Sequence, residues 1–423
     1  MRANLLAALI GMLGVAGCGG GSSDIANSGS GSGGTTPSGS NVQAVTVDSG
    51  PAVIANSNTP ALNTLYTTVI VCSPGSTTNC QTIDHIQVDT GSTGLRIISS
   101  VLTITLPLQT DANNNVIAEC TQFVDGSSWG PIRQADVKIA GETASTQEVQ
   151  VIGDAAYPTI PTACTGTGTN AENTVTAFGA NGILGVGPFL QDCGPGCEQQ
   201  GHAVYFTCPT VTTCADSGMP LALQVANPVA SFTTDNNGVI IQLASVGTTG
   251  AAAAAGYLIF GIGTQSNNGL GSATVLMLNS DGSLTTNYKL GSLQSSFIDS
   301  GSNAYYFPDS TIATCANNTA APGFFCPTST LALSGTMVSP INGTSVTVNF
   351  SVANANSLFP SGSVIAAANN IAAPSTSVNN TGGSSSFGSD SFDWGLPFYY
   401  GRSVYTAIET RNTSGGAGPY FAF

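Results

Sequence analysis

Most of the chain beyond residue 42 consists of short apolar runs separated by Gly, Asn and Pro, and the periodicity of amphipathic helices is almost absent. The runs are rich in Val, Ile, Thr, Tyr and Phe, which favour strands. The clearest predicted strands are Leu65–Cys72, Ala135–Ile139, Gln147–Ile152, Tyr257–Phe260 and Val404–Ile408. With 52 Gly and 21 Pro available for turns, the pattern predicts an all-β fold.

Two apolar runs end in turns that are nearly copies of each other. They are Val88-Asp89-Thr90-Gly91-Ser92-Thr93-Gly94 and Ile298-Asp299-Ser300-Gly301-Ser302-Asn303. In each turn, glycine permits a close approach of the backbone and the hydroxyls can hydrogen-bond to the carboxylate. One such turn would be weak evidence, because this sequence suits many turns, but two copies about half the chain apart indicate a duplicated design.

A second pair of matching segments follows the first. Asn181–Gly185 comes after the first turn, and Asp393–Phe398 comes after the second. Gly185 lies 96 residues after Asp89, and Gly395 lies 96 residues after Asp299. A repeat on this scale predicts two lobes of one design.

These segments resemble the motifs of the pepsin-like aspartic peptidases, over roughly residues 42 to 423. The resemblance implies a bilobal all-β fold with two pseudo-twofold-related lobes, an N-terminal lobe at 42–230 that carries a flap and a C-terminal lobe at 231–423. It also implies that Asp89 and Asp299 form a catalytic dyad that shares one proton. The ionised carboxylate would take a proton from water while the protonated one donates to the substrate carbonyl, without metal, organic cofactor or nucleophilic side chain.

The resemblance assigns supporting roles to the residues that follow each aspartate. The hydroxyl residues directly after the aspartates would reach the backbone of the opposite lobe, and the glycines would let the turns approach the dyad. The serines two positions further on would hydrogen-bond the outer carboxylate oxygens. The dyad-supporting residues are Thr90, Gly91, Ser92, Ser300, Gly301 and Ser302.

The segment 123–130 has turn residues in the middle of a predicted hairpin and resembles the flap that covers the cleft in this family. The residues assigned to the flap and substrate cleft are Phe123, Asp125, Gly126, Ser127 and Trp129. Phe123 takes the position at which the family usually has a Tyr, and it can pack there but has no hydroxyl. Trp129 would supply an N–H donor instead, or else serve as a core aromatic.

Two further positions depart from the family pattern. Arg96 stands where the family usually has an aromatic residue. Asp393 occupies an apolar position of the second glycine segment, and we expect it to face solvent. Turned toward the dyad, its carboxylate would raise the pKa of the dyad by like-charge repulsion.

The chain has 11 cysteines, and an even number remains if Cys18 carries lipid. In an exported chain these predict disulfides, with Cys72–Cys80 closing a hairpin loop and Cys315–Cys326 closing a loop after the second motif. Cys120 with Cys164 is a further possible pair. The remaining cysteines leave their pairing open, and a zinc site is the less favoured alternative for them in an oxidising compartment. They are Cys193, Cys197, Cys208 and Cys214.

Residues 1–17 are typical of a lipoprotein signal peptide, with a basic start, a short apolar run and small residues before Cys18. The run is shorter than the roughly 20 apolar residues of a transmembrane helix. Residues 18–41, mostly Gly, Ser, Thr and Asn, predict a flexible tether. We therefore expect lipid anchoring through Cys18 in a bacterial cell envelope, and Gly19 favours the outer membrane.

The charge balance is acidic, with 7 Lys+Arg against 22 Asp+Glu, which disfavours nucleic acid as a partner. We expect a monomer that takes a polypeptide substrate or peptide ligand in its cleft. The leading hypothesis is an aspartic endopeptidase. The alternative is a catalytically weak or inactive lipoprotein of the same fold that binds a peptide or an envelope partner.

Overall fold

The computed structural model describes residues 37–124, 126–165, 170–289, 291–359, 364–375 and 390–423. The predicted signal peptide, Cys18 and most of the predicted tether lie outside the described residues, as does Asp125. Residues Pro37–Phe423 form one unit. Within the described ranges, no helix has the length and apolar character needed to cross a membrane.

Strands account for 42% of the structure and helices for 10%, which confirms the all-β fold. The longer strands alternate between buried and more exposed side chains. In β19 (Ser345–Val352), Val348, Phe350 and Val352 are buried while Asn349 is exposed, because successive side chains of a strand point to opposite faces.

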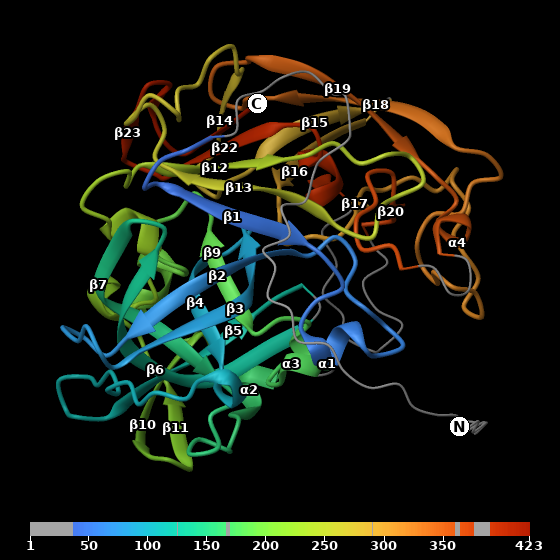
Figure 1. Cartoon of the computed structure of the whole chain (residues 1–423). Coiled ribbons are helices and arrows are strands. Elements are labelled where there is room, and N and C mark those ends of the chain that lie inside the picture. Colours follow the sequence, from blue (N-terminus) through green and yellow to red (C-terminus); the bar gives the residue numbers. More distant parts are fainter. Residues whose placement is uncertain (1–36, 125, 166–169, 290, 360–363, 376–389) are drawn as a thin grey trace, which may run out of the picture. The chain divides into compact units, whose positions relative to one another are not determined.

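The first half of the chain forms a sheet around the long hairpin of β6 and β7 (Figure 1). Its strands are β2 (Leu65–Cys72), β3 (Cys80–Asp89), β4 (Thr93–Ile98), β5 (Val116–Gln122), β6 (Gly126–Ile139), β7 (Glu142–Ile152), β8 (Asn170–Ala171), β9 (Gly182–Val186), β10 (Tyr205–Thr210) and β11 (Thr213–Asp216).

The sheet continues from the first half into the second through β1, which pairs with β13 along six residues and with β2 at its end (Figure 1). From there the order runs through β12, β22, β25 and β14, so early and late strands share one sheet. These strands are β1 (Val42–Val47), β12 (Gly238–Leu243), β13 (Ala254–Phe260), β14 (Val275–Met277), β22 (Ser403–Ala407) and β25 (Tyr420–Ala422).

The second half adds a sheet of its own, in the order β19-β18-β15-β16-β21-β17-β20. Its remaining strands are β15 (Leu284–Tyr288), β16 (Gly291–Ile298), β17 (Tyr305–Tyr306), β18 (Leu331–Val338), β20 (Ala372–Ala373) and β21 (Asp393–Trp394). A small hairpin joins β23 (Asn412–Thr413) to β24 (Gly416–Ala417). The helical segments are single turns: α1 (Ala52–Ala55), α2 (Thr162–Thr165), α3 (Val175–Phe178), α4 (Ala355–Leu358), η1 (Ser99–Val101), η2 (Gly194–Glu198), η3 (Leu221–Leu223), η4 (Pro228–Ser231) and η5 (Leu396–Tyr399).

The two halves repeat one strand arrangement around the two aspartate turns. In the first half, β3 pairs parallel with β9, β9 pairs antiparallel with β4, and β4 pairs parallel with β7. In the second half, β16 pairs parallel with β21, β21 pairs antiparallel with β17, and β17 pairs parallel with β20. The 96-residue repeat therefore corresponds to a duplicated topology.

The two halves pack their cores differently. Around the first turn the core is aliphatic, with Val88, Leu95 and Leu184 buried. Around the second it is aromatic, since Trp394 stacks on Phe392 at 4.1 Å between ring centroids and Phe392 stacks on Phe307 at 4.8 Å.

Disulfides close loops at the edges of these sheets. Cys72–Cys80 and Cys315–Cys326 form as the sequence predicted, and the possible pair Cys120–Cys164 forms as well. The four remaining cysteines form the disulfides Cys193–Cys197 and Cys208–Cys214. Because these four sulfurs are bonded to one another, they cannot serve as thiolate ligands, and the alternative of a zinc site was wrong.

Candidate active site

The two aspartates lie at the ends of equivalent strands. Asp89 ends β3 and pairs with Gly185 of β9, while Asp299 follows β16 and its backbone N–H donates to the carbonyl of Trp394 at 3.1 Å. Each turn packs directly under its partner glycine. A Cβ added at Gly185 would lie 2.5 Å from the nitrogen of Thr93, so only glycine fits there.

The carboxyl groups of Asp89 and Asp299 face each other across the two turn glycines. A Cβ at Gly91 would lie 2.7 Å from the Cγ of Asp299, and a Cβ at Gly301 would clash with an oxygen of Asp89. Each carboxyl therefore occupies the space that a side chain on the opposite turn would need. Both aspartates are buried, with 6% and 9% of their surface exposed.

Thr90 and Ser300 brace the two turns against each other. Thr90 Oγ1 donates to the carbonyl of Ile298 at 3.2 Å, and Ser300 Oγ donates to the carbonyl of Val88 at 2.9 Å. Each hydroxyl also accepts a hydrogen bond from the backbone N–H of the other residue, at 3.1 and 2.9 Å. Four reciprocal bonds in a fully buried setting hold the carboxyl groups at a fixed separation.

The hydrogen bonds to the two carboxylates are not symmetric. Gly91 N–H donates to Asp89 Oδ1 and Gly301 N–H donates to Asp299 Oδ1, both at 2.7 Å. Ser302 Oγ donates to Asp299 Oδ2 at 2.9 Å. The equivalent hydroxyl of Ser92 is buried and has no hydrogen-bond partner among the described residues, so the expectation that it binds Asp89 was wrong.

The surroundings of Asp299 favour its protonated form. Burial, and then the charge of the neighbouring Asp89 carboxylate, raise the pKa of Asp299 well above its usual range. The N–H of Gly301 acts in the opposite direction but is the smaller influence. Asp299 is therefore suited to serve as a proton donor.

The dyad lies in a cleft of about 1580 Å³. Gln87, Ser92 and Phe189 line it on the side of the first half, and Ser302, Asn303 and Phe324 line it on the side of the second. A cleft of this size takes an extended segment of several residues and not only a small molecule.

Phe123 is the one predicted flap residue that lines this cleft within the described chain. It lies in the turn between β5 and β6, where its N–H donates to the carbonyl of Gly126 at 2.8 Å. Its ring meets the ring of Phe178 edge to face, with centroids 5.7 Å apart. At the predicted flap position, the cleft is therefore lined by an aromatic pair and not by a tyrosine hydroxyl.

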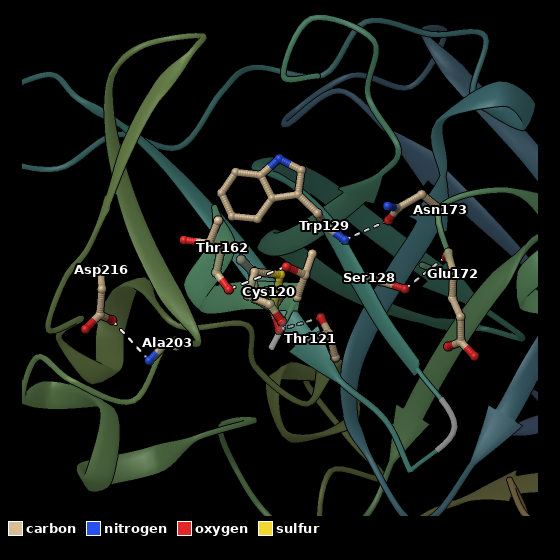
Figure 2. The surroundings of a disulfide bond; sticks show 12 residues. Cys120, Thr121, Ser128, Trp129, Thr162, Glu172, Asn173, Ala203 and Asp216 are labelled. Carbon is tan, nitrogen blue, oxygen red and sulfur yellow. Dashed lines mark hydrogen bonds between the residues drawn. A yellow bond between two sulfur atoms is a disulfide. The ribbon is translucent and has the colours of Figure 1, made fainter. Parts of the chain in front are cut away.

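The other described flap residues are buried away from the cleft. Trp129 is 2% exposed, its indole N–H donates to the carbonyl of Tyr157 at 3.1 Å, and its ring packs on Phe206. Figure 2 shows this ring beside the Cys120–Cys164 disulfide. Trp129 is a core aromatic, the alternative that the sequence left open for it; Gly126 and Ser127 begin the second strand of the predicted flap hairpin but do not line the cleft.

Arg96 lies fully buried in the wall of the cleft and binds the strand that leads to the flap. Its guanidinium donates to Glu119 at 2.6 Å, to Asp192 at 2.8 Å and to the Thr121 hydroxyl at 2.8 Å. Burial, and then the charge of Glu119, raise the pKa of Asp192 well above its usual range. Arg96 is paired with both carboxyls of this buried cluster.

Asp393 does not face solvent, and that expectation was wrong. It is the first residue of β21, is 0% exposed, and neither carboxyl oxygen has a hydrogen-bond partner among the described residues. Burial raises the pKa of Asp393 well above its usual range; the adjacent Ser302 hydroxyl lowers it and the Asp89 charge raises it further.

Sequence reasoning missed the partners of Arg96 and the hydroxyl that contacts Thr90. Tyr399 OH lies 2.8 Å from Thr90 Oγ1 and belongs to η5, directly after the second glycine segment. The sequence signal for Tyr399 is its place four residues after Gly395 of the second glycine segment. No sequence signal pointed to Glu119 or Asp192, although an arginine in a buried strand requires carboxylates.

The duplicated strand order and the cross-braced aspartate turns define a bilobal all-β fold of the pepsin-like type. The chain belongs to the family described as Protein of unknown function (DUF3443), whose pattern matches residues 37–423. No curated protein matches the chain. Among solved structures it is similar to the aspartic proteinase from Irpex lacteus, with 15% identity, coverage of 90% of this chain and 96% of that chain, and a TM-score of 0.48.

Proposed function

We propose that this protein is an aspartic endopeptidase that cleaves polypeptides bound in extended form in its cleft. The observation that supports this most directly is the placement of Asp89 and Asp299, each against the glycine of the opposite turn, at a cleft that fits a peptide. The cross-braced turns would keep this geometry constant through the reaction.

In the proposed reaction, a water between the carboxyls attacks the carbonyl carbon of the scissile bond. Asp89 takes a proton from this water, and Asp299 gives its proton to the carbonyl oxygen, which leaves a tetrahedral diol. The diol then collapses: Asp89 gives its proton to the nitrogen, one diol hydroxyl returns a proton to Asp299, and the C–N bond breaks to release an acid and an amine. The dyad ends with one proton, as it began.

The raised pKa of Asp299 fixes the sign of the pH dependence. Activity requires a proton on Asp299 and none on Asp89. It is therefore lost as the pH rises through the pKa of Asp299, and it is lost at low pH when both carboxyls are protonated.

The test is cleavage of an unstructured protein and of a mixed peptide library from about pH 3 to 7, a range that brackets the titration of a carboxyl dyad. We expect Asp89→Ala and Asp299→Ala each to lose at least about 10²-fold in kcat/KM, since the two groups act as one unit. A statine-type transition-state analogue should block the wild type. Asp136→Asn, which alters a buried carboxylate of β6 that binds Gly75 and Thr146 N–H groups, is the matched control.

Absence of cleavage at every pH, by protein with its disulfides formed, would contradict the proposal. The second candidate is then a pepsin-fold protein that binds a peptide or envelope partner without cleaving it, and Phe123 in the flap favours it because it offers no hydroxyl to substrate. Retention of library peptides by the wild type, unchanged in mass, would distinguish this candidate.

We further propose that the protein is anchored to a bacterial envelope membrane through lipid on Cys18, a proposal that rests on the sequence of residues 1–18. Labelling with radioactive palmitate should appear in the full chain and vanish in Cys18→Ser. Labelling that persists in the variant would contradict this.

A further inference from the structure

Asp393 is a buried acid that the proposed reaction does not use. It has 0% exposure and no hydrogen bond to either oxygen within the described chain. A carboxylate in that condition is costly, because it has lost water without gaining a donor. An acid that lowers the stability of the fold in this way is expected to have a role in function.

The fold itself does not need a carboxyl at this position. The 96-residue repeat makes Ile183 the equivalent of Asp393, since Ile183 pairs with Gln87, two residues before Asp89, in the same way that Asp393 pairs with Phe297, two residues before Asp299. Ile183 is an ordinary buried aliphatic residue. The second half therefore carries an acid where its own repeat carries a methyl-bearing side chain.

Ser302 connects Asp393 to the dyad. Its hydroxyl lies against the Asp393 carboxyl, and its single hydrogen goes to Asp299 Oδ2 at 2.9 Å. That hydrogen is therefore not available to Asp393, whose carboxyl oxygens have no hydrogen-bond partner among the described residues. Ser302 lies between the two carboxyls, and its hydrogen bond goes to Asp299 only.

The charged and titratable groups that act on Asp393 are all acidic or neutral. Asp89 and Asp299 lie on the two turns, Tyr399 on η5, and Tyr306 faces it in register on β17. Among the described residues, no cation is paired with its carboxyl. Negative charge on Asp393 is therefore felt directly by its acidic neighbours.

We propose that Asp393 is a positioning residue of the active site, whose buried carboxyl without a hydrogen-bond donor, beside the strand that leads to Asp299, keeps the proton on Asp299 to a higher pH than the dyad alone would allow. This inference rests on the proposed peptidase function but can be tested without it. The Asp393 charge is one of the causes that raise the pKa of Asp299, after burial and the charge of Asp89. The working pH range of the site is thereby extended upward.

The experiment measures kcat/KM against pH for the wild type, Asp393→Asn and Asp393→Ile. Asn keeps the shape without the charge, and Ile is the residue that the equivalent position carries. In both variants the alkaline limb of the profile should move down by about one pH unit, the usual scale for a neighbouring charge. Asp136→Asn, a buried carboxylate remote from the dyad, should leave the limb in place while lowering stability.

A ¹³C NMR titration of the aspartate carboxyl groups gives a readout independent of activity. The resonance that disappears in Asp299→Asn identifies Asp299, and its midpoint should fall in Asp393→Asn. If the wild type cleaves nothing but this midpoint falls, the inference stands and the peptidase proposal fails. If the wild type is active but neither the limb nor the midpoint moves in either variant, the inference is overturned and the peptidase proposal remains.

Discussion

The two halves of the active site share a strand order, but each buries an ionisable residue of a different charge. The first half buries a basic residue, and the second half buries an acidic residue on the strand that pairs with the equivalent position. In the first half Arg96 lies opposite Ile183, and in the second half Tyr306 lies opposite Asp393. Arg96 has two carboxylates and a hydroxyl as partners. Asp393 has none that meet hydrogen-bond geometry within the described residues.

The charge of Arg96 therefore has a structural role, whereas the charge of Asp393 acts on the dyad. The guanidinium of Arg96 donates hydrogen bonds to Glu119 of β5 and to Asp192, so neighbouring carboxyls compensate its positive charge. The charge of Asp393 is uncompensated and acts on Asp299. One half of the repeat therefore uses its buried ion to hold the cleft wall, and the other uses it to set the protonation of the site.

The largest effect is expected on the compensated side. Arg96→Met would leave Glu119 and Asp192 buried without their cation, and it should lower the free energy of unfolding at pH 7 by about 3–5 kcal/mol. The carboxyls would then have raised pKa values in the folded state, so the loss should shrink toward pH 4, where they take up protons. Urea unfolding at both pH values measures this.

The control for Arg96 is the variant in which Glu119 and Asp192 are also made apolar. Replacing the whole buried cluster should recover most of the lost stability, because no uncompensated charge remains. An equal loss at pH 4 and pH 7 in Arg96→Met would mean that packing and not charge makes Arg96 important.

The opposite sign is expected on the uncompensated side. Asp393→Ile should raise the free energy of unfolding at pH 7 by about 1–4 kcal/mol, because it removes a buried carboxyl with no donor. The folded-state pKa of Asp393 is raised, so the native protein holds its proton longer than the unfolded chain does. Its cost therefore grows as the pH rises above the pKa of Asp393 in the unfolded chain, is complete above the folded-state pKa, and is absent at pH 3, where both states are protonated.

Thermal unfolding at pH 3 and pH 7 checks this prediction. A gain at pH 7 that vanishes at pH 3, together with a lowered alkaline limb, would identify Asp393 as an acid kept for function at the expense of stability. A loss of stability at both pH values would mean that Asp393 is part of the packing of the second half, and the contrast with Arg96 would then fail.

The fold followed from the sequence because its signals are local and occur twice. Gly185 and Gly395 must be glycine, since any Cβ would strike the turn beneath, and the spacing to each aspartate was visible without a structure. The predicted strands could be read from apolar runs rich in strand-favouring residues, and two disulfides from the short loops they close.

The errors concern side-chain direction and long-range partners, which no short sequence window specifies. Trp129 lies three residues from the described flap turn, but alternation along β6 turns its ring into the core formed with Phe206. Whether Asp393 faced solvent depended on packing by Tyr306 and Ser302, which come from elsewhere in the chain. The partners of Arg96 lie 23 and 96 residues away.

The smallest expected effect compares the two serines that follow the aspartates. Ser92 Oγ has no partner among the described residues, so Ser92→Ala should change stability by less than about 0.5 kcal/mol and leave the pH profile in place. Ser302→Ala removes the donor to Asp299 Oδ2, which stabilises the ionised carboxylate. The pKa of Asp299 should then rise and move the alkaline limb upward, opposite in direction to Asp393→Asn. Equal profiles for the two alanine variants would show that the dyad is symmetric in solution, and the comparison of the halves would hold only for their buried ions.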